Sequence, residues 1–217
     1  MSMKTPAQTK RRYDGSGRQR DATERQARII DAAHARFVRD GYGATSIDQI
    51  ARDAGTSAQT VYAAFGNKVG ILRRVVDVAI AGDHDEVALI DRPEQQAVFI
   101  APDIAARLEL AVDVAVRTHA RSAHLIALTQ SLAGGDPAAR ELADDLERQV
   151  RTDTERFLGA AAGHLRDLPM SRLVDITLLI TGPSSWHRLV NESGWTPDEW
   201  RTWVLEAMQH LVVAPGS

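Results

Sequence analysis

The stretch that decides the fold is residues 41–72, GYGATSIDQIARDAGTSAQTVYAAFGNKVGIL. Ser46 and Gln49 have the S-x-x-Q spacing of a capping box, which predicts a helix that begins just after Ser46. Gly55 can adopt the left-handed backbone conformation that ends a helix. Between these limits, apolar side chains recur at helical spacing, at Ile47, Ile50, Ala51 and Ala54.

A second short helix is expected directly after this turn. Ser57 is a suitable N-cap for it, and Gly66-Asn67 interrupts it before a further helix begins at Lys68. Its apolar residues are Val61, Ala64 and Phe65. Two short helices joined by a glycine turn have the layout of a helix-turn-helix, a DNA-binding motif.

Two helices of about two turns each are too short to be stable alone. The preceding segment, Thr23 to Asp40, is expected to supply a third helix, which Gly41 ends. Its apolar stripe consists of Ile29, Ile30, Ala33 and Phe37. We therefore predict a three-helix DNA-binding domain.

The composition predicts an all-α protein and excludes several chemistries. The chain has 217 residues, 5% aromatic residues and no cysteine, so disulfides, thiolate zinc sites and cysteine nucleophiles are excluded. No apolar run reaches the roughly 18 residues of a membrane span, and the N-terminus does not have the pattern of a signal peptide. We expect a cytoplasmic protein with no membrane partner.

Charge is divided unevenly along the chain. Residues 1–81 hold 14 Lys and Arg against 8 Asp and Glu, whereas residues 82–217 hold 12 against 21. A local excess of positive charge is what binding to a polyanion selects, and here it coincides with the helix-turn-helix. The alternative is ordinary variation of charge along a chain.

Three segments are expected. Residues 1–22 are polar and basic, which predicts a disordered arm. Residues 23–81 are expected to form the DNA-binding domain with the start of its connecting helix, and residues 82–217 are expected to form a second domain. The arm either reaches a minor groove or the phosphates, or is a solvated tail. Its basic residues include Lys10, Arg11, Arg12, Arg18 and Arg20.

The second domain is expected to be a helical bundle, giving about nine helices in the whole chain. Asp103 can cap one helix, a short helix is expected near 122–132, and Pro137 suits the first turn of a long helix to about Ala162. Residues 170–181 and a helix after Thr196 complete the bundle.

The last two predicted helices carry an unusual apolar load. Residues 170–181 are apolar nearly all around the axis, which indicates burial on more than one side. A second subunit would cover them, and an internal core stripe is the alternative. The predicted dimer interface comprises Leu173, Ile176, Ile180, Trp200, Trp203, Val204, Met208 and Leu211.

Residues 24–72 as a whole resemble the DNA-binding domain of TetR-family transcriptional regulators, from ERQARIIDAAHARF through the recognition helix to the lysine that opens the next helix. GWTPDEWRTWVLEAMQHLV, near the end, resembles the regulatory domain of some members. The resemblance implies an all-α homodimer that binds a palindromic double-stranded operator, usually as a repressor. A small molecule bound in the second domain would release it.

The resemblance also implies roles for individual residues. Thr45 and Ser46 would touch phosphate, Gln59 and Thr60 would face base edges, Tyr62 would contact the backbone, and Lys68 would meet phosphate. The recognition helix departs from the family pattern because alanine stands at positions 58, 63 and 64, where basic or aromatic residues are common. Tyr62 as a core residue and Lys68 as a surface lysine are the alternatives.

The ligand of the second domain is not identified by the sequence. The candidate pocket residues are His119, His124, Leu128, Phe157 and Trp186, although a histidine on an apolar face is more often a core residue. No metal site and no cofactor is expected. The chain lacks a Glu-x-x-His pair, a phosphate loop and a nucleophile elbow, so an enzyme is disfavoured. The remaining alternative is an architectural DNA-binding dimer that senses no ligand.

Overall fold

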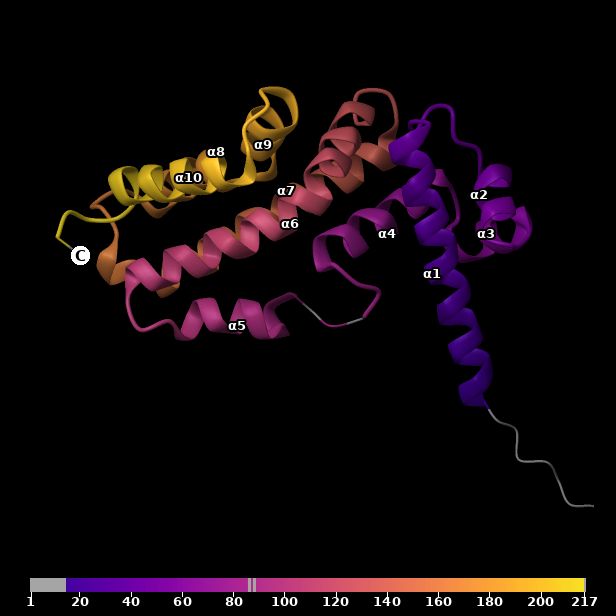
Figure 1. Cartoon of the computed structure of the whole chain (residues 1–217), viewed down its shortest axis with the longest axis horizontal. Helices are drawn as coiled ribbons and strands as arrows, with labels where there is room; N and C mark the ends of the chain where they lie inside the picture. Colours follow the sequence, from indigo (N-terminus) through magenta and orange to yellow (C-terminus); the bar gives the residue numbers. More distant parts are fainter. Residues whose placement is uncertain (1–14, 86, 88, 217) are drawn as a thin grey trace, which may run out of the picture. The chain divides into compact units, whose positions relative to one another are not determined.

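The computed structural model describes residues 15–85, 87 and 89–216, and it is all-α, which confirms the predicted fold class (Figure 1). The described chain forms two compact units, one ending at Lys68 and one beginning at Val69. The predicted domain boundary at residue 81 is therefore 13 residues too late, because nearly all of the connecting helix belongs to the second unit.

The first unit is built from three helices, α1 (Gly15–Arg39), α2 (Ile47–Asp53) and α3 (Ala58–Phe65). Arg36 of α1 binds Asp53 at the end of α2 through two hydrogen bonds, of 2.6 and 3.0 Å. This ion pair keeps the pKa of the Asp53 carboxyl below its usual value. Each helix contributes buried side chains to the core, which contains Ile29, Ile30, Ala33, Phe37, Ile50, Ala51, Ala54 and Val61.

The start of α1 corrects the prediction for the arm. Residues 15–22 are helical, so they are not part of a disordered arm, and Arg18 and Arg20 lie within α1. Arginine, glutamine and alanine favour helix, and the segment has no proline to interrupt a helix that is already anchored further along. Lys10, Arg11 and Arg12 lie outside the described residues.

The second unit is a bundle of helices. Lys68–Ala81 forms α4, whose residues from Val69 on belong to this unit, followed by α5 (Pro93–Ile100), α6 (Ile104–Leu132) and α7 (Pro137–Ala160). The chain then forms α8 (Met170–Thr181), α9 (Pro183–Trp186), a π-helical turn (His187–Glu192) and α10 (Pro197–Leu211). Short 3-10 segments occur at Leu89–Asp91 and Ala162–His164.

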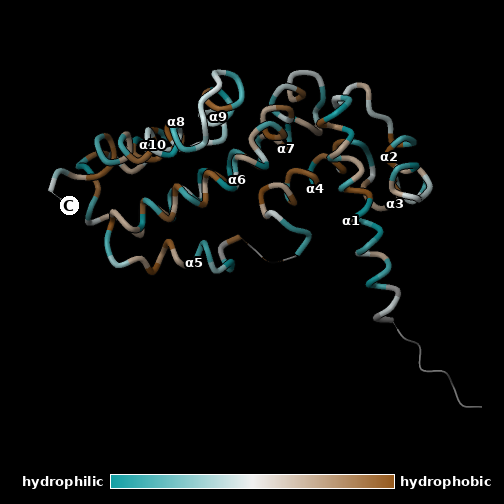
Figure 2. The backbone as a smooth tube through the Cα atoms, in the orientation of Figure 1, coloured by the Kyte–Doolittle hydropathy of each residue, from teal (hydrophilic) through white to brown (hydrophobic). Residues whose placement is uncertain are grey.

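The predicted helix starts after Asp103, Asp136 and Thr196 are confirmed. Each side chain accepts a hydrogen bond from a backbone N–H of the first turn, and Thr196 forms a capping box with Glu199. The prediction of a separate short helix near residues 122–132 is wrong, because α6 is one continuous helix of 29 residues. No glycine or proline interrupts it before Gly134. Brown and teal alternate along α6 in Figure 2, as expected for a helix with one buried face.

The apolar residues of α8 and α10 correct the predicted dimer interface. Leu173, Ile180, Trp200, Val204 and Met208 are at most 4% exposed and lie in the core of the second unit of their own chain. Such side chains have no surface to offer a partner, so these five residues belong to an internal core stripe. Amphipathic spacing reveals which face is covered but not what covers it. Ile176, Trp203 and Leu211 retain exposed surface.

No helix in the described part of the chain combines the length and apolar character needed to cross a membrane.

Trp200→Ala tests the assignment of Trp200 to the core. The indole is fully buried, donates a hydrogen bond to Ser185 Oγ at 3.1 Å and packs edge-on against Trp186 with ring centroids 5.0 Å apart. We expect the free energy of unfolding in urea to fall by about 3–5 kcal/mol. The half-buried Trp203 is the control, and Trp203→Ala should cost less. A Trp200→Ala protein of unchanged stability would contradict the assignment.

Candidate nucleic-acid interface and internal cavity

The predicted helix-turn-helix is present, with the expected caps. Ser46 Oγ accepts a hydrogen bond from Gln49 N at 3.2 Å, and Gln49 Oε1 accepts one from Ser46 N at 2.8 Å, which completes the capping box. Gly55 has φ +66°, the left-handed conformation predicted for the turn. Ser57 Oγ accepts from Thr60 N and caps α3. These caps fix the α2–turn–α3 geometry locally.

Helix α3 has one buried and one exposed face. Val61 is fully buried, whereas Gln59, Tyr62 and Ala63 are exposed at spacings of three and four residues and form the outward face, here called the reading face. Tyr62 is 53% exposed, so it is not a core residue. Thr60 is half-buried, and its hydroxyl lies 2.9 Å from that of Ser57. The reading face therefore presents few polar groups.

The two residues predicted to contact phosphate at the start of α2 differ in their exposure to solvent. Thr45 is 2% exposed and its hydroxyl donates to Gly41 O at 2.8 Å, so the predicted side-chain contact of Thr45 with phosphate is wrong. The hydroxyl stabilises the turn between α1 and α2 instead. Ser46 is exposed, and its hydroxyl oxygen accepts the cap hydrogen bond from Gln49 N. The hydroxyl proton can therefore still be donated to a phosphate.

Lys68 has a structural role that sequence reasoning missed. Its ammonium donates to Tyr42 O at 2.8 Å and to Thr45 O at 2.9 Å, and it lies 4.2 Å from the centre of the Tyr42 ring. Partial burial lowers the pKa of this ammonium. Lys68 thus ties the first residue of α4 to the α1–α2 turn, and its contact with phosphate stays a prediction.

A cavity of about 250 Å³ lies within the second unit. Its wall is built from α4 to α8 and α10 and is mostly apolar. His119 and Phe157 line it, as predicted. The apolar residues of the wall include Ile80, Val98, Phe99, Leu108, Val112 and Met208.

Three of the predicted pocket residues do not line this cavity. Because α6 is continuous, His124 and Leu128 lie further along it than His119, by about 7 and 13 Å. Trp186 is buried in the core, with its ring centroid 6.1 Å from that of His119. The sequence did not identify Thr177, which does line the cavity.

His119 is the most unusual polar group of the cavity. Its Nε2 lies 2.8 Å from Thr181 O. Burial lowers the pKa of His119 to about 4, so the ring is neutral at pH 7. Nδ1 is buried and has no hydrogen-bond partner among the described residues, and the same is true of the Thr177 hydroxyl. The cavity wall therefore contains two buried polar side chains with an unmet hydrogen bond.

Residues 29–75 match the family model for bacterial regulatory proteins of the tetR family. An HTH-type transcriptional repressor from Streptomyces coelicolor is 37% identical over 67 residues, which is 29% of this chain and 35% of the relative. Residues 29–75 therefore form a DNA-binding domain of the TetR type. TetR proteins form a family of transcription regulators and not of enzymes, in agreement with the expectation from sequence.

Solved structures share the fold of this chain. A TetR transcription regulator from Haloarcula marismortui has a TM-score of 0.66 at 16% identity, covering 88% of this chain and 99% of its own. A protein from Saccharomonospora viridis assigned as a transcriptional regulator, solved in complex with choline, has a TM-score of 0.66 at 19% identity, with the same coverage. At these identities the likeness shows the fold alone.

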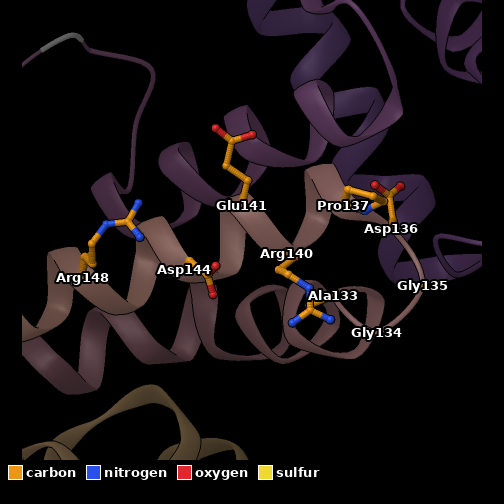
Figure 3. Close-up of a pocket in the computed structure, with 9 residues that line it drawn as sticks. All are labelled: Ala133, Gly134, Gly135, Asp136, Pro137, Arg140, Glu141, Asp144 and Arg148. Atoms are coloured by element: carbon orange, nitrogen blue, oxygen red, sulfur yellow. The ribbon is translucent and has the colours of Figure 1, made fainter.

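A second hollow lies where α6 is followed by α7, and Figure 3 shows the side chains that line it. Asp136 caps α7 there, and Arg140 and Glu141 point to different sides of the helix. The lining residues all come from 133–148, and the charged side chains at 140, 141, 144 and 148 are exposed. This arrangement is typical of a solvated helix surface. The described residues contain no cluster of three or more His, Cys, Asp or Glu placed to hold a metal ion.

His119 predicts a pH dependence of stability. A histidine in the unfolded chain has a pKa of about 6.5. Between pH 6.5 and 4, His119 therefore binds a proton in the unfolded chain but not in the folded chain. Stability from this group is complete above pH 6.5 and falls as the pH drops toward 4, by about 3 kcal/mol. Urea unfolding of wild type and His119→Gln between pH 7 and 4.5 measures the difference.

His119→Gln should flatten this pH dependence, because carboxylates such as Asp53 are present in both proteins and contribute equally. His164 is exposed, so His164→Gln should keep the wild-type profile. Parallel pH profiles for wild type and His119→Gln would contradict the assignment of a buried neutral histidine.

Proposed function

We propose that this chain is a sequence-specific transcriptional regulator, a repressor that leaves a palindromic DNA operator when a small molecule fills the cavity of the second unit. The observation that carries the proposal is the presence, in one chain, of a capped helix-turn-helix and a cavity with two unpaired polar groups. The partial match to a Streptomyces coelicolor repressor supports the direction of regulation.

The exposed residues of α3 suit DNA reading. A glutamine such as Gln59 can form two hydrogen bonds with adenine, and the Thr60 methyl can contact a thymine methyl. Tyr62 is exposed and can donate its hydroxyl to a phosphate. Ala63 adds only a methyl group to the reading face. We therefore expect few base contacts and a large share of affinity from phosphates, with Ser46 and Lys68 among the donors.

The cavity is lined in part by α4, which is the helix that follows α3 in sequence. Ile80, in the last turn of α4, lines the cavity. Arg121 of α6 donates to Ala79 O at 3.0 Å and Ile80 O at 3.2 Å, so it binds the free carbonyls at the C-terminus of α4. A ligand in the cavity would touch this turn directly. That contact, and the choline complex of a protein with this fold, favour a sensor over a ligand-independent architectural protein.

A palindromic operator has two half-sites related by symmetry, and two helix-turn-helix domains are needed to bind them. The proposed regulator is therefore a homodimer. The apolar surface left exposed on α8 and α10 fits a second copy of the chain. Leu179 is 78% exposed and Leu211 is 51% exposed, while Ile176 and Trp203 are half-buried. The five buried residues of α8 and α10 described above pack in the core on the inner side of these helices.

Selection of bound fragments from the source genome by the purified protein tests DNA reading. We expect a palindromic sequence to be recovered, and Gln59→Ala should weaken binding to it by about 1–3 kcal/mol because the base contact is lost. Gln130→Ala, at an exposed position of α6, is the control and should bind as wild type does. Recovery of random fragments, or equal binding by both variants, would contradict the proposal.

Leu179→Asp tests the dimer surface. A buried, unpaired carboxylate at a subunit interface is unfavourable, so sedimentation should show this variant as a monomer at concentrations where wild type is a dimer. Ile100→Asp is a matched control, because Ile100 is 79% exposed on α5. Dissociation by both variants, or by neither, would count against this surface.

A further inference from the structure

We infer that the cavity binds an uncharged, largely apolar small molecule that carries a hydroxyl group, and that this hydroxyl donates a hydrogen bond to His119. The inference rests on the proposed sensor function and gives its effector a chemical class. It is carried by the two unpaired polar atoms in the wall, by the tautomer of His119 and by the location of the charged residues.

The tautomer of His119 is fixed by its backbone partner. A carbonyl oxygen can only accept, so the contact of 2.8 Å between Nε2 and Thr181 O places the ring proton on Nε2. Because the ring is neutral, Nδ1 is then a bare lone pair. A ligand that meets it must donate a hydrogen bond, as a hydroxyl or N–H does and as an ether, ester or carboxylate does not.

Thr177 provides the second unmet group. Its hydroxyl is buried and has no partner among the described residues. Two further hydroxyls of the wall already have partners, since Thr154 donates to Val150 O at 2.8 Å and Thr181 to Thr177 O at 2.9 Å. The Thr177 hydroxyl can donate to the oxygen of the same ligand or accept from it.

The charges of the wall argue against an ionised ligand. Asp153 and Arg156 are its ionisable residues besides His119, and both are exposed. Asp153 also accepts a hydrogen bond from Gln149 at 3.0 Å. A buried cation or anion would thus lack a buried counter-charge, which is costly in an apolar cavity. The volume of about 250 Å³ is small beside the roughly 300–1,000 Å³ usual for ligand sites, so the molecule is small.

Calorimetric titration of the full chain, without DNA, with 1-octanol and with heptyl methyl ether tests the inference. The two compounds are isomers of the same size, and only the alcohol has a hydrogen-bond donor. We expect the alcohol to bind about tenfold more tightly, because the ether leaves Nδ1 unpaired. Octanoate and octylammonium should both bind more weakly than the alcohol.

Two variants locate the preference. His119→Phe removes the acceptor and should reduce the ratio of alcohol to ether affinity to about one. Thr177→Val is nearly isosteric and removes the second hydroxyl without a ring change, so it should lower alcohol affinity even if the phenylalanine variant does not fold. His164→Phe, at an exposed position, is the control and should keep the wild-type ratio.

The outcomes separate this inference from the proposed function. Equal binding of alcohol and ether, tighter binding of either charged compound, or no binding of the alcohol would overturn the inference. A chain that prefers the alcohol but keeps its operator when the alcohol is bound would overturn the sensor function and leave the ligand class standing. Release of the operator by octylammonium would support the sensor and contradict the ligand class.

Discussion

Hydrogen bonds at the two ends of α4 are the constraint on which the proposed mechanism depends. At its start, the Lys68 ammonium holds the carbonyls of Tyr42 and Thr45, and at its end the Arg121 guanidinium holds those of Ala79 and Ile80. In the proposed mechanism, a ligand acts on the last turn of α4 in the cavity wall, and the same helix runs back without a break to Lys68.

The unpaired polar groups of the cavity wall lower the stability of the folded chain, and a core with only a structural role would not contain them. Burying His119 as a neutral ring with an unpaired Nδ1, next to an unpaired Thr177 hydroxyl, costs about 1–3 kcal/mol for each unmet group. Trp186 and Trp200 pack against one another and each lies beside the imidazole, so the two indoles help to hold the ring in place. Local departures from a fully satisfied core are typical of functional sites.

Local signals in the sequence predicted the local structure well. Ser46, Ser57, Asp103 and Thr196 cap helices as expected, because a cap is a contact over two or three residues. The burial of Thr45 was missed because part of its surroundings is distant in sequence, since the Lys68 ammonium that binds Thr45 O lies 23 residues along the chain. Spacing also could not separate core from interface on α8 and α10, since Leu173 and Leu179 look alike until their neighbours are known. His119 was recognised as a candidate, but its tautomer depends on Thr181, 62 residues away.

The most direct test of the central claim is the affinity of the purified protein for its selected operator, measured by fluorescence anisotropy with and without saturating 1-octanol. If the cavity and the helix-turn-helix are coupled, the alcohol should weaken operator binding by about 5- to 150-fold, and the operator should weaken alcohol binding by the same factor. An operator affinity that does not change while calorimetry shows the alcohol bound would contradict the account.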